Sequence, residues 1–394
     1  MGPPTANAAL PELVAERLMA RNPVSRAFFA REARRLAEAC REMADRFGRG
    51  GRLLAFGRGA CATDAQHVSV EFVHPVIVGK RALPALDLSA AFEVLVPALV
   101  RPDDMVMGFS LPAGDPQVEA VLREADDRGA QTFALPGSSG RYAVPPPCPD
   151  AFIQQELVEI LYHTLWETVH VYLEHQPGGD AEVGASAFLY PFLTDAPQDT
   201  GGVVAEVEAS IVAKAATCER LRETTASGQA PNIAAAAAAM AERTAAGGTL
   251  MFLGNGGSAT DANDGALDCA AAGIPALSLS MEPATITAVA NDIGRDEIFL
   301  RQLIAQSRPG DVAVAISTSG GSSNVIAALA EARRRGLLTV ALLGYDGGEI
   351  ARRGLADHAI VVACDYIPRI QEVQASTYHV IVETLAMLRG HPRG

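Results

Sequence analysis

Short apolar segments alternate with longer amphipathic segments along the whole chain. The apolar segments have the length of strands and lie at 53–56, 106–109, 131–135, 250–253, 312–316 and 338–343. The amphipathic segments have the length of helices and lie at about 25–46, 151–175, 205–225, 232–246 and 369–390. Continuous apolar strands that alternate with helices are typical of a parallel sheet covered on both faces. The pattern therefore predicts an α/β fold.

The second half of the chain repeats the first half. The segment that begins Arg101-Pro102-Asp103-Asp104 matches a segment that begins 207 residues later, Arg308-Pro309-Gly310-Asp311. Further matches lie upstream, at a spacing of 197 residues, and downstream, at a spacing of 216 residues. Because a chance match would not keep its order and spacing, we interpret the chain as a tandem duplication of one domain. We predict domains at 1–176 and 203–394, joined by a linker at 177–202 that is rich in Pro, Gly, Asp and Ala.

Composition restricts the class of protein. The 394 residues are 49% apolar and 20% charged, as in a globular chain with a large core. The net charge is −14, and no basic stripe is present, so we expect no nucleic-acid partner. No apolar run is long enough to span a bilayer, so we expect no membrane association. Six widely spaced cysteines and the lack of a leader pattern at the start predict a cytoplasmic protein.

Two polar loops in the second half are candidate phosphate sites. Gly254-Asn255-Gly256-Gly257-Ser258 follows one predicted strand, and a cluster of hydroxyl side chains, Ser317 to Ser323, follows another. Backbone amides and hydroxyl groups bind phosphate without a formal positive charge. Loops at the carboxyl ends of parallel strands are where open α/β sheets bind ligands. Ordinary tight turns with local caps are the alternative interpretation.

Five elements in a fixed order carry a family resemblance. They are the two loops, Asn291-Asp292, Arg369-Ile370-Gln371-Glu372 and His379. With them the chain resembles the sugar isomerase (SIS) domain family and, within it, the phosphoheptose isomerases. These enzymes convert sedoheptulose 7-phosphate to a manno-heptose 7-phosphate. The resemblance is clear over about 203–390 and weak over 10–175.

The resemblance implies a fold and a ligand site. The fold is two tandem SIS domains, each a flavodoxin-like three-layer sandwich. The residues implied to bind the sugar phosphate are Asn255, Gly256, Gly257, Ser258, Asn291, Asp292, Ser317, Thr318, Ser319, Ser322 and Gln371. In the family a metal, usually zinc, is held by His and Glu one turn apart on the helix after the first loop, together with Gln and His of the last helix.

The two halves depart from the family pattern in opposite ways. The second half has Asp264 and Asp268 at the expected His and Glu positions, whereas the first half has His67 and Glu71. Their spacing of four residues places both side chains on one helix face. In the first half, however, Ser110-Leu111-Pro112-Ala113-Gly114-Asp115 replaces the hydroxyl cluster, and its proline and carboxylate do not suit a phosphate. We therefore expect phosphate to bind in the second half and not at this segment.

The implied metal ligands form two alternative sets. The first is His67, Glu71, Gln155 and His163 of the first half. The second is Asp264, Asp268, Gln371 and His379, which is richer in oxygen donors.

The leading hypothesis is a metal-assisted aldose–ketose isomerase that acts through an enediolate. Glu71 is the expected base, and His379 or His163 is its acid/base partner. We expect the first domain to supply His67 and Glu71 to a phosphate held by the second, in a homodimer with four SIS domains. The alternatives are an isomerase of another sugar phosphate and a non-catalytic SIS module that binds sugar phosphates or proteins to regulate or assemble something.

Overall fold

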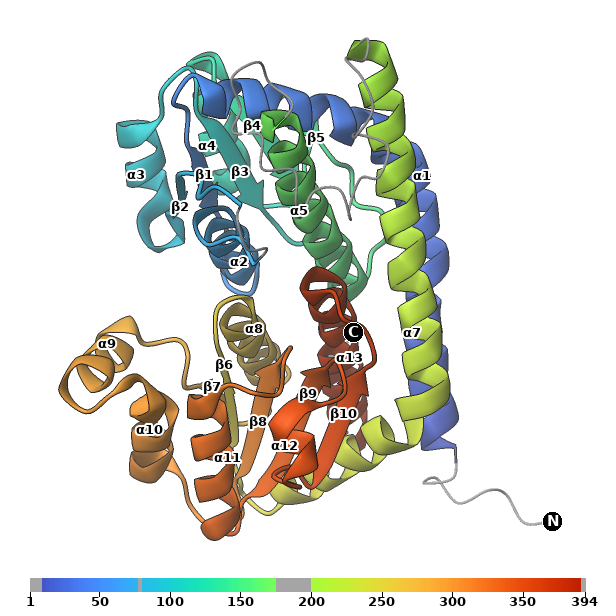
Figure 1. Ribbon diagram of the computed structural model, residues 1–394, viewed down its shortest axis with the longest axis vertical. Helices are drawn as coiled ribbons and strands as arrows, with labels where there is room; N and C mark the ends of the chain where they lie inside the picture. The colour runs from blue at the N-terminus through green and yellow to red at the C-terminus, as the bar shows by residue number, and fades with distance from the viewer. Residues whose placement is uncertain (1–8, 77–79, 175–199, 391–394) are drawn as a thin grey trace. The chain divides into compact units, whose positions relative to one another are not determined.

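The computed structural model describes residues 9–76, 80–174 and 200–390, and it is drawn in Figure 1. The chain divides into two compact units, which we describe separately. The N-terminal unit is Pro23–Thr217, and the C-terminal unit combines Met1–Asn22 with Cys218–Gly394. Two long helices, α1 (Leu10–Gly48) and α7 (Thr200–Ala245), each contribute to both units.

The N-terminal unit contains a five-stranded sheet in which each pair of neighbours is parallel, in the order β2-β1-β3-β4-β5. The central strands are wholly buried. The strands are β1 (Leu53–Phe56), β2 (Ala85–Asp87), β3 (Met105–Phe109), β4 (Gln131–Leu135) and β5 (Tyr142–Ala143). The helices are α2 (Cys61–Val73), α3 (Phe92–Leu99), α4 (Pro116–Asp127) and α5 (Ala151–Glu174), with a short 3₁₀ turn at Ser89–Ala91.

The C-terminal unit contains a second parallel sheet of five strands, in the equivalent order β7-β6-β8-β9-β10. The strands are β6 (Leu250–Gly254), β7 (Ala276–Ser278), β8 (Val312–Ser317), β9 (Leu338–Gly344) and β10 (His358–Val362). The helices are α8 (Gly257–Ala271), α9 (Pro283–Asp292), η3 (Arg295–Glu297), α10 (Ile298–Gln306), α11 (Ser323–Arg334), α12 (Gly348–Arg352) and α13 (Ile367–Leu388). The predicted α/β fold class, two parallel sheets with flanking helices, is confirmed.

The six predicted strands are all present, whereas the sheets also contain strands that were not predicted. These are β2, β5, β7 and β10, which lie toward the sheet edges. β2 and β7 are short and only partly buried, so they lack the continuous apolar runs by which the central strands were predicted. β10 does contain such a run, Ala359 to Val362, which was not predicted as a strand. The helical segments predicted at 205–225 and 232–246 belong to one helix, because α7 continues through Pro231. Residues 177–199 of the predicted linker lie outside the described residues. The rest of the predicted linker belongs to α7, which begins at Thr200.

Each unit is completed by a helical segment from outside its own half of the sequence. In the C-terminal unit, Arg17 Nη1 donates to Thr384 Oγ1 at 3.0 Å, and Arg21 Nη2 pairs with Glu383 Oε1 at 3.2 Å. In the N-terminal unit, Lys214 of α7 pairs with Glu167 of α5. Arg17 Nε also lies 3.6 Å from Glu383 Oε2. This pair and Lys214–Glu167 occupy equivalent places in the sequence repeat, because their cations lie 197 residues apart and their carboxylates 216 residues apart.

All six cysteines lie in the described part of the chain, and none of them forms a disulfide. Burial raises the pKa of the Cys40 thiol to about 12, so this thiol is protonated and unreactive at neutral pH. Within 9–76, 80–174 and 200–390, no helix has both the length and the apolar character required to cross a bilayer.

We expect the Glu383→Gln substitution to destabilise the protein. The side chain of Arg21 is only 3% exposed, so removing the charge of Glu383 takes a carboxylate partner away from a buried guanidinium. The free energy of unfolding should fall by about 1–3 kcal/mol, as measured by urea denaturation. The control is Glu38→Gln in the exposed Arg34–Glu38 pair, which should change it by less than about 1 kcal/mol. Equal effects of the two substitutions would contradict a structural role for the segment that carries Arg21.

Candidate functional site

The hydroxyl loop of the C-terminal unit connects β8 to α11 and is held in one conformation. Ser317 Oγ accepts a hydrogen bond from the Gly320 amide at 3.2 Å, and Ser319 Oγ accepts one from the Gly321 amide at 3.2 Å. Gly320 has φ of 60°, and a Cβ atom there would lie 2.2 Å from the carbonyl oxygen of Gly347. Only glycine fits this close backbone approach. The loop is therefore a rigid arrangement of hydroxyl and amide groups.

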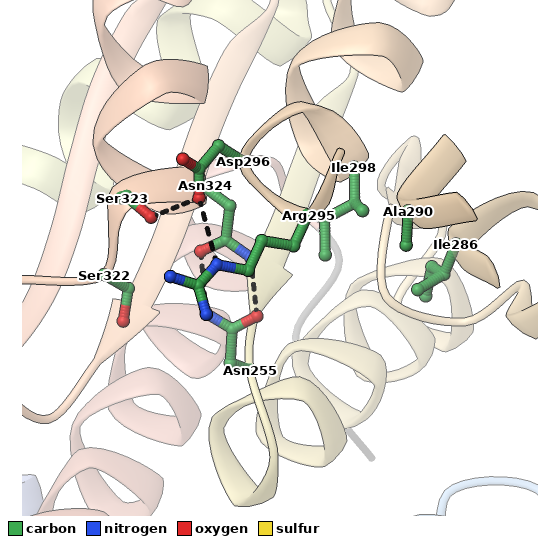
Figure 2. A pocket seen from close by; sticks show the side chains of 9 residues that line it. All are labelled: Asn255, Ile286, Ala290, Arg295, Asp296, Ile298, Ser322, Ser323 and Asn324. Atoms are coloured by element: carbon green, nitrogen blue, oxygen red, sulfur yellow. Dashed lines mark hydrogen bonds and ion pairs between the residues drawn. The ribbon is translucent and has the colours of Figure 1, made fainter. Parts of the chain in front are cut away.

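The first glycine loop, between β6 and α8, is tied to the second by a pair of amides. The side chains of Asn255 and Asn324 exchange two hydrogen bonds, each 2.9 Å long, as Figure 2 shows. The oxygen and the nitrogen of the Asn255 side-chain amide are thus both hydrogen-bonded within the protein. The sequence analysis did not select Asn324, because nothing local to it indicates that it faces the other loop.

A cavity of about 390 Å³ lies beside these loops (Figure 2). Its wall combines polar side chains with a few apolar ones: Asn255, Ile286, Ala290, Arg295, Asp296, Ile298, Ser322, Ser323 and Asn324. Of the predicted phosphate ligands, only Asn255 and Ser322 line this cavity. The cavity also contains a cation, Arg295, that the sequence analysis missed.

The other predicted phosphate ligands lie in several places. Ser317, Thr318 and Ser319 form the hydroxyl loop itself, next to the cavity-lining Ser322. Gly256, Gly257 and Ser258 lie in the first loop and the first turn of α8. Asn291 and Asp292 are exposed at the end of α9 and bond to each other at 2.8 Å. Gln371 is buried on α13.

The equivalent loop of the N-terminal unit is closed by the protein's own side chains. Asp115 caps α4, where its carboxylate accepts hydrogen bonds from the amides of Gln117 at 2.8 Å and Val118 at 3.3 Å. Arg58 of the first loop pairs with Asp115 at 3.3 Å and with Glu93 at 2.8 Å. By contrast, Ser322 at the start of α11 makes no side-chain capping bond. This difference supports the prediction that an anion binds in the C-terminal unit only.

A buried cluster of possible metal ligands lies in the N-terminal unit. His67 and Glu71 of α2 meet His163 of α5, and each is at most 2% exposed. His67 Nε2 lies 3.4 Å from His163 Nε2 and 3.8 Å from Glu71 Oε1. Gln155 Nε2 donates to Thr63 Oγ1 at 3.5 Å, which places Gln155 against the same helix. Two imidazole nitrogens that face each other beside a carboxylate fit a cation well, and this donor set is one that zinc prefers.

The C-terminal unit has a second buried cluster at the equivalent helix positions. His379 Nε2 of α13 lies 3.3 Å from Asp264 Oδ2 and 3.4 Å from Asp268 Oδ2 of α8. The hydroxyl of Tyr378 donates to Asp264 Oδ2 at 2.8 Å, a partner that the sequence analysis did not select. Two carboxylates around one imidazole can stabilise a protonated histidine or bind a cation that prefers oxygen.

Part of the chain is similar in sequence to known proteins. A family model described as SIS domain matches residues 215–344. The phosphoheptose isomerase of Geotalea daltonii is 42% identical over 161 residues, which cover 39% of this chain and 83% of that protein. The phosphoheptose isomerase of Chlorobaculum parvum is 43% identical over 181 residues, which cover 44% of this chain and 86% of that protein.

A solved structure matches nearly the whole chain. It is the C-terminal domain of glucosamine-fructose-6-phosphate aminotransferase from Francisella tularensis, with a TM-score of 0.55 and 12% identity. The match covers 98% of this chain and 95% of that one. At this identity, the likeness shows the fold alone.

We expect Ser319→Ala and Ser322→Ala to weaken the binding of inorganic phosphate. Each substitution removes a hydroxyl donor, and a hydrogen bond to a charged group contributes about 1.5–3 kcal/mol at most. Isothermal titration measures the dissociation constant. Ser110→Ala is the matched control in the N-terminal unit, where the loop is closed by Asp115, and it should leave phosphate binding unchanged. If only the Ser110→Ala control bound phosphate more weakly, the anion site would lie in the N-terminal unit and the prediction would be wrong.

Proposed function

The chain belongs to the SIS-domain family, and from this premise we propose that it is an aldose–ketose isomerase of sugar phosphates. Its relatives at 42% and 43% identity are phosphoheptose isomerases. The proposed reaction is the conversion of sedoheptulose 7-phosphate to D-glycero-D-manno-heptose 7-phosphate. The observation that carries the proposal is the rigid hydroxyl loop of residues 317–322, which lies beside a polar cavity in a matched family segment. Such a loop suits the phosphate of the substrate.

Phosphate recognition would rest on hydrogen-bond donors. The chain carries a net charge of −14, so a phosphate needs a local group of donors that offsets the general repulsion. Hydroxyl groups of Ser317, Thr318, Ser319 and Ser322 and the loop amides supply these donors. Because Gly320 and the amide pair of Asn255 fix the loop, little conformational entropy is lost when the ligand binds.

The buried histidines and carboxylates would transfer the protons. The reaction requires a base that moves a proton between C1 and C2, and an acid that serves the sugar oxygens. We assign the base to Glu71 and the acid to His163, which belongs to the same cluster, or to His379. Burial of these groups excludes water, which strengthens their electrostatic effect on the developing enediolate.

The proposed metal ligands are His67, Glu71 and His163, with Gln155 beside them. Two imidazoles and a carboxylate match zinc, whereas the alternative set of Asp264, Asp268, Gln371 and His379 is better matched to a cation that prefers oxygen. When bound, a divalent metal supplies a Lewis acid that polarises the substrate carbonyl. A carboxylate has two oxygens, so Glu71 can hold a cation through one and exchange a proton through the other.

A non-catalytic SIS module is the second candidate. It is favoured by the replacement of the family's His and Glu with Asp264 and Asp268 and by the closure of the N-terminal loop with Asp115. Such a module would bind a sugar phosphate without converting it.

The proposed function is tested by turnover of sedoheptulose 7-phosphate together with elemental analysis for bound metal. Glu71→Gln keeps the shape of the side chain and removes the base, so turnover should fall by about 10²–10⁴-fold. Inorganic phosphate should bind this variant as tightly as it binds the wild type. Asp268→Asn, at the equivalent position of the C-terminal unit, should reduce turnover much less.

The outcomes separate the candidates. If the wild type binds phosphate but does not convert the sugar, the chain is a binding module. If Asp268→Asn abolishes turnover and Glu71→Gln does not, the base lies in the C-terminal cluster. If the wild type contains zinc and His67→Ala loses it, the metal belongs to the N-terminal cluster.

We also propose that the chain forms a homodimer, as the family resemblance implies. Sedimentation velocity at micromolar concentration should then give the mass of two chains. An active monomer would contradict this proposal.

A further inference from the structure

The cavity of the C-terminal unit contains one formal cation. Among its lining residues, Arg295 is the only basic side chain and Asp296 the only acidic one. Arg295 extends from η3 across the cavity wall that also carries Asn255 and Asn324 (Figure 2). The preceding residue, Gly294, has φ of 143°, a conformation that favours glycine and that fixes where η3 begins.

Arg295 is only loosely held by the protein. An ion pair joins Arg295 Nε to Asp296 Oδ1 at 3.7 Å, and the side chain of Arg295 is 92% exposed. An exposed pair at this distance contributes little to stability. Asp296 has a better partner, because its Oδ1 accepts a hydrogen bond from the Ser323 hydroxyl at 2.5 Å. The guanidinium can therefore leave Asp296 without leaving that carboxylate unsatisfied.

The cavity and the hydroxyl loop share a residue. Ser322 lines the cavity and also ends the loop that begins at Ser317. An anion held by this loop therefore borders the space into which Arg295 extends. A phosphate dianion offers three oxygens with more charge than the carboxylate of Asp296, so it is the stronger partner for a guanidinium.

We propose that Arg295 is a specificity-determining residue, which moves from Asp296 to the phosphate of the bound sugar and makes the site select dianionic ligands. This inference rests on the proposed function of the same site. Hydroxyl and amide donors bind neutral sugar oxygens as well as phosphate oxygens. Such donors therefore distinguish only weakly between a neutral sugar and a sugar phosphate. A guanidinium adds an attraction that depends on the ligand's charge, which the acidic chain otherwise opposes.

The test compares Arg295→Gln with Arg301→Gln. Arg301 lies on the neighbouring helix α10, is exposed and does not line the cavity, so it provides the same change of charge outside the site. The probe is inorganic phosphate, titrated by calorimetry at several salt concentrations. We expect Arg295→Gln to bind phosphate roughly tenfold more weakly, the effect of one charge-assisted hydrogen bond, and to show a smaller salt dependence. Arg295→Lys should recover part of the affinity.

Each outcome decides the proposal. If Arg295→Gln weakens phosphate binding and Arg301→Gln does not, the assignment is supported. In turnover assays the same variant should then raise KM with little change in kcat. If both variants bind phosphate as the wild type does, Arg295 has no role in recognition, while the proposed function stands. If the wild type itself binds no phosphate, the inference and the proposed phosphate site both fail.

Discussion

The close approach of backbone to backbone at the carboxyl ends of the strands is the constraint on which the rest of the structure depends. A Cβ atom on Gly254 would lie 2.2 Å from the carbonyl oxygen of Ser258, and one on Gly57 would lie 2.2 Å from that of Cys61. Both units therefore turn from their first strand into the following helix in the same way. Because the turn is fixed by backbone contacts, the side chains around it can change without loss of the fold.

The two units use this freedom differently. In the N-terminal unit, Asp115 satisfies the amides at the start of α4 and Arg58 covers the loop, so the unit gains a cap and ion pairs. In the C-terminal unit, Ser322 leaves the start of α11 without a side-chain cap, and the hydroxyl loop lies beside a cavity. The carboxylate cap of Asp115 contributes to the stability of α4. At the start of α11, Asn324 Oδ1 accepts a hydrogen bond from the Val325 amide at 2.9 Å but Ser322 caps no amide, so this helix N-terminus is better suited to an anion than that of α4.

Sequence patterns predicted the parts of the fold that burial controls. The central strands β1, β3, β6 and β8 are buried on both faces, and a continuous apolar run records that burial. Edge strands such as β7 are only partly buried and leave no such run. In the same way, spacing along helices predicted that His67 and Glu71 share a face. It did not predict Tyr378 or Asn324, because their partners Asp264 and Asn255 lie far away in the sequence. It did not predict Arg295, because nothing local in the sequence shows that this residue lines a cavity.

The equivalent tyrosines contact the two buried clusters in different ways. In the C-terminal unit, the Tyr378 hydroxyl donates to Asp264 Oδ2, the same oxygen that lies 3.3 Å from His379 Nε2. That oxygen therefore already accepts a hydrogen bond from the protein, which leaves it less available to a cation. In the N-terminal unit, the ring of Tyr162 packs 5.2 Å from that of His67, at the position equivalent to Asp264. His67 Nε2 lies 3.4 Å from His163 Nε2 and 3.8 Å from Glu71 Oε1, so two imidazoles and a carboxylate meet in the N-terminal cluster. Two carboxylates and one imidazole meet in the C-terminal cluster. The first donor set is one that zinc prefers, whereas the second is richer in the oxygen ligands that harder cations prefer.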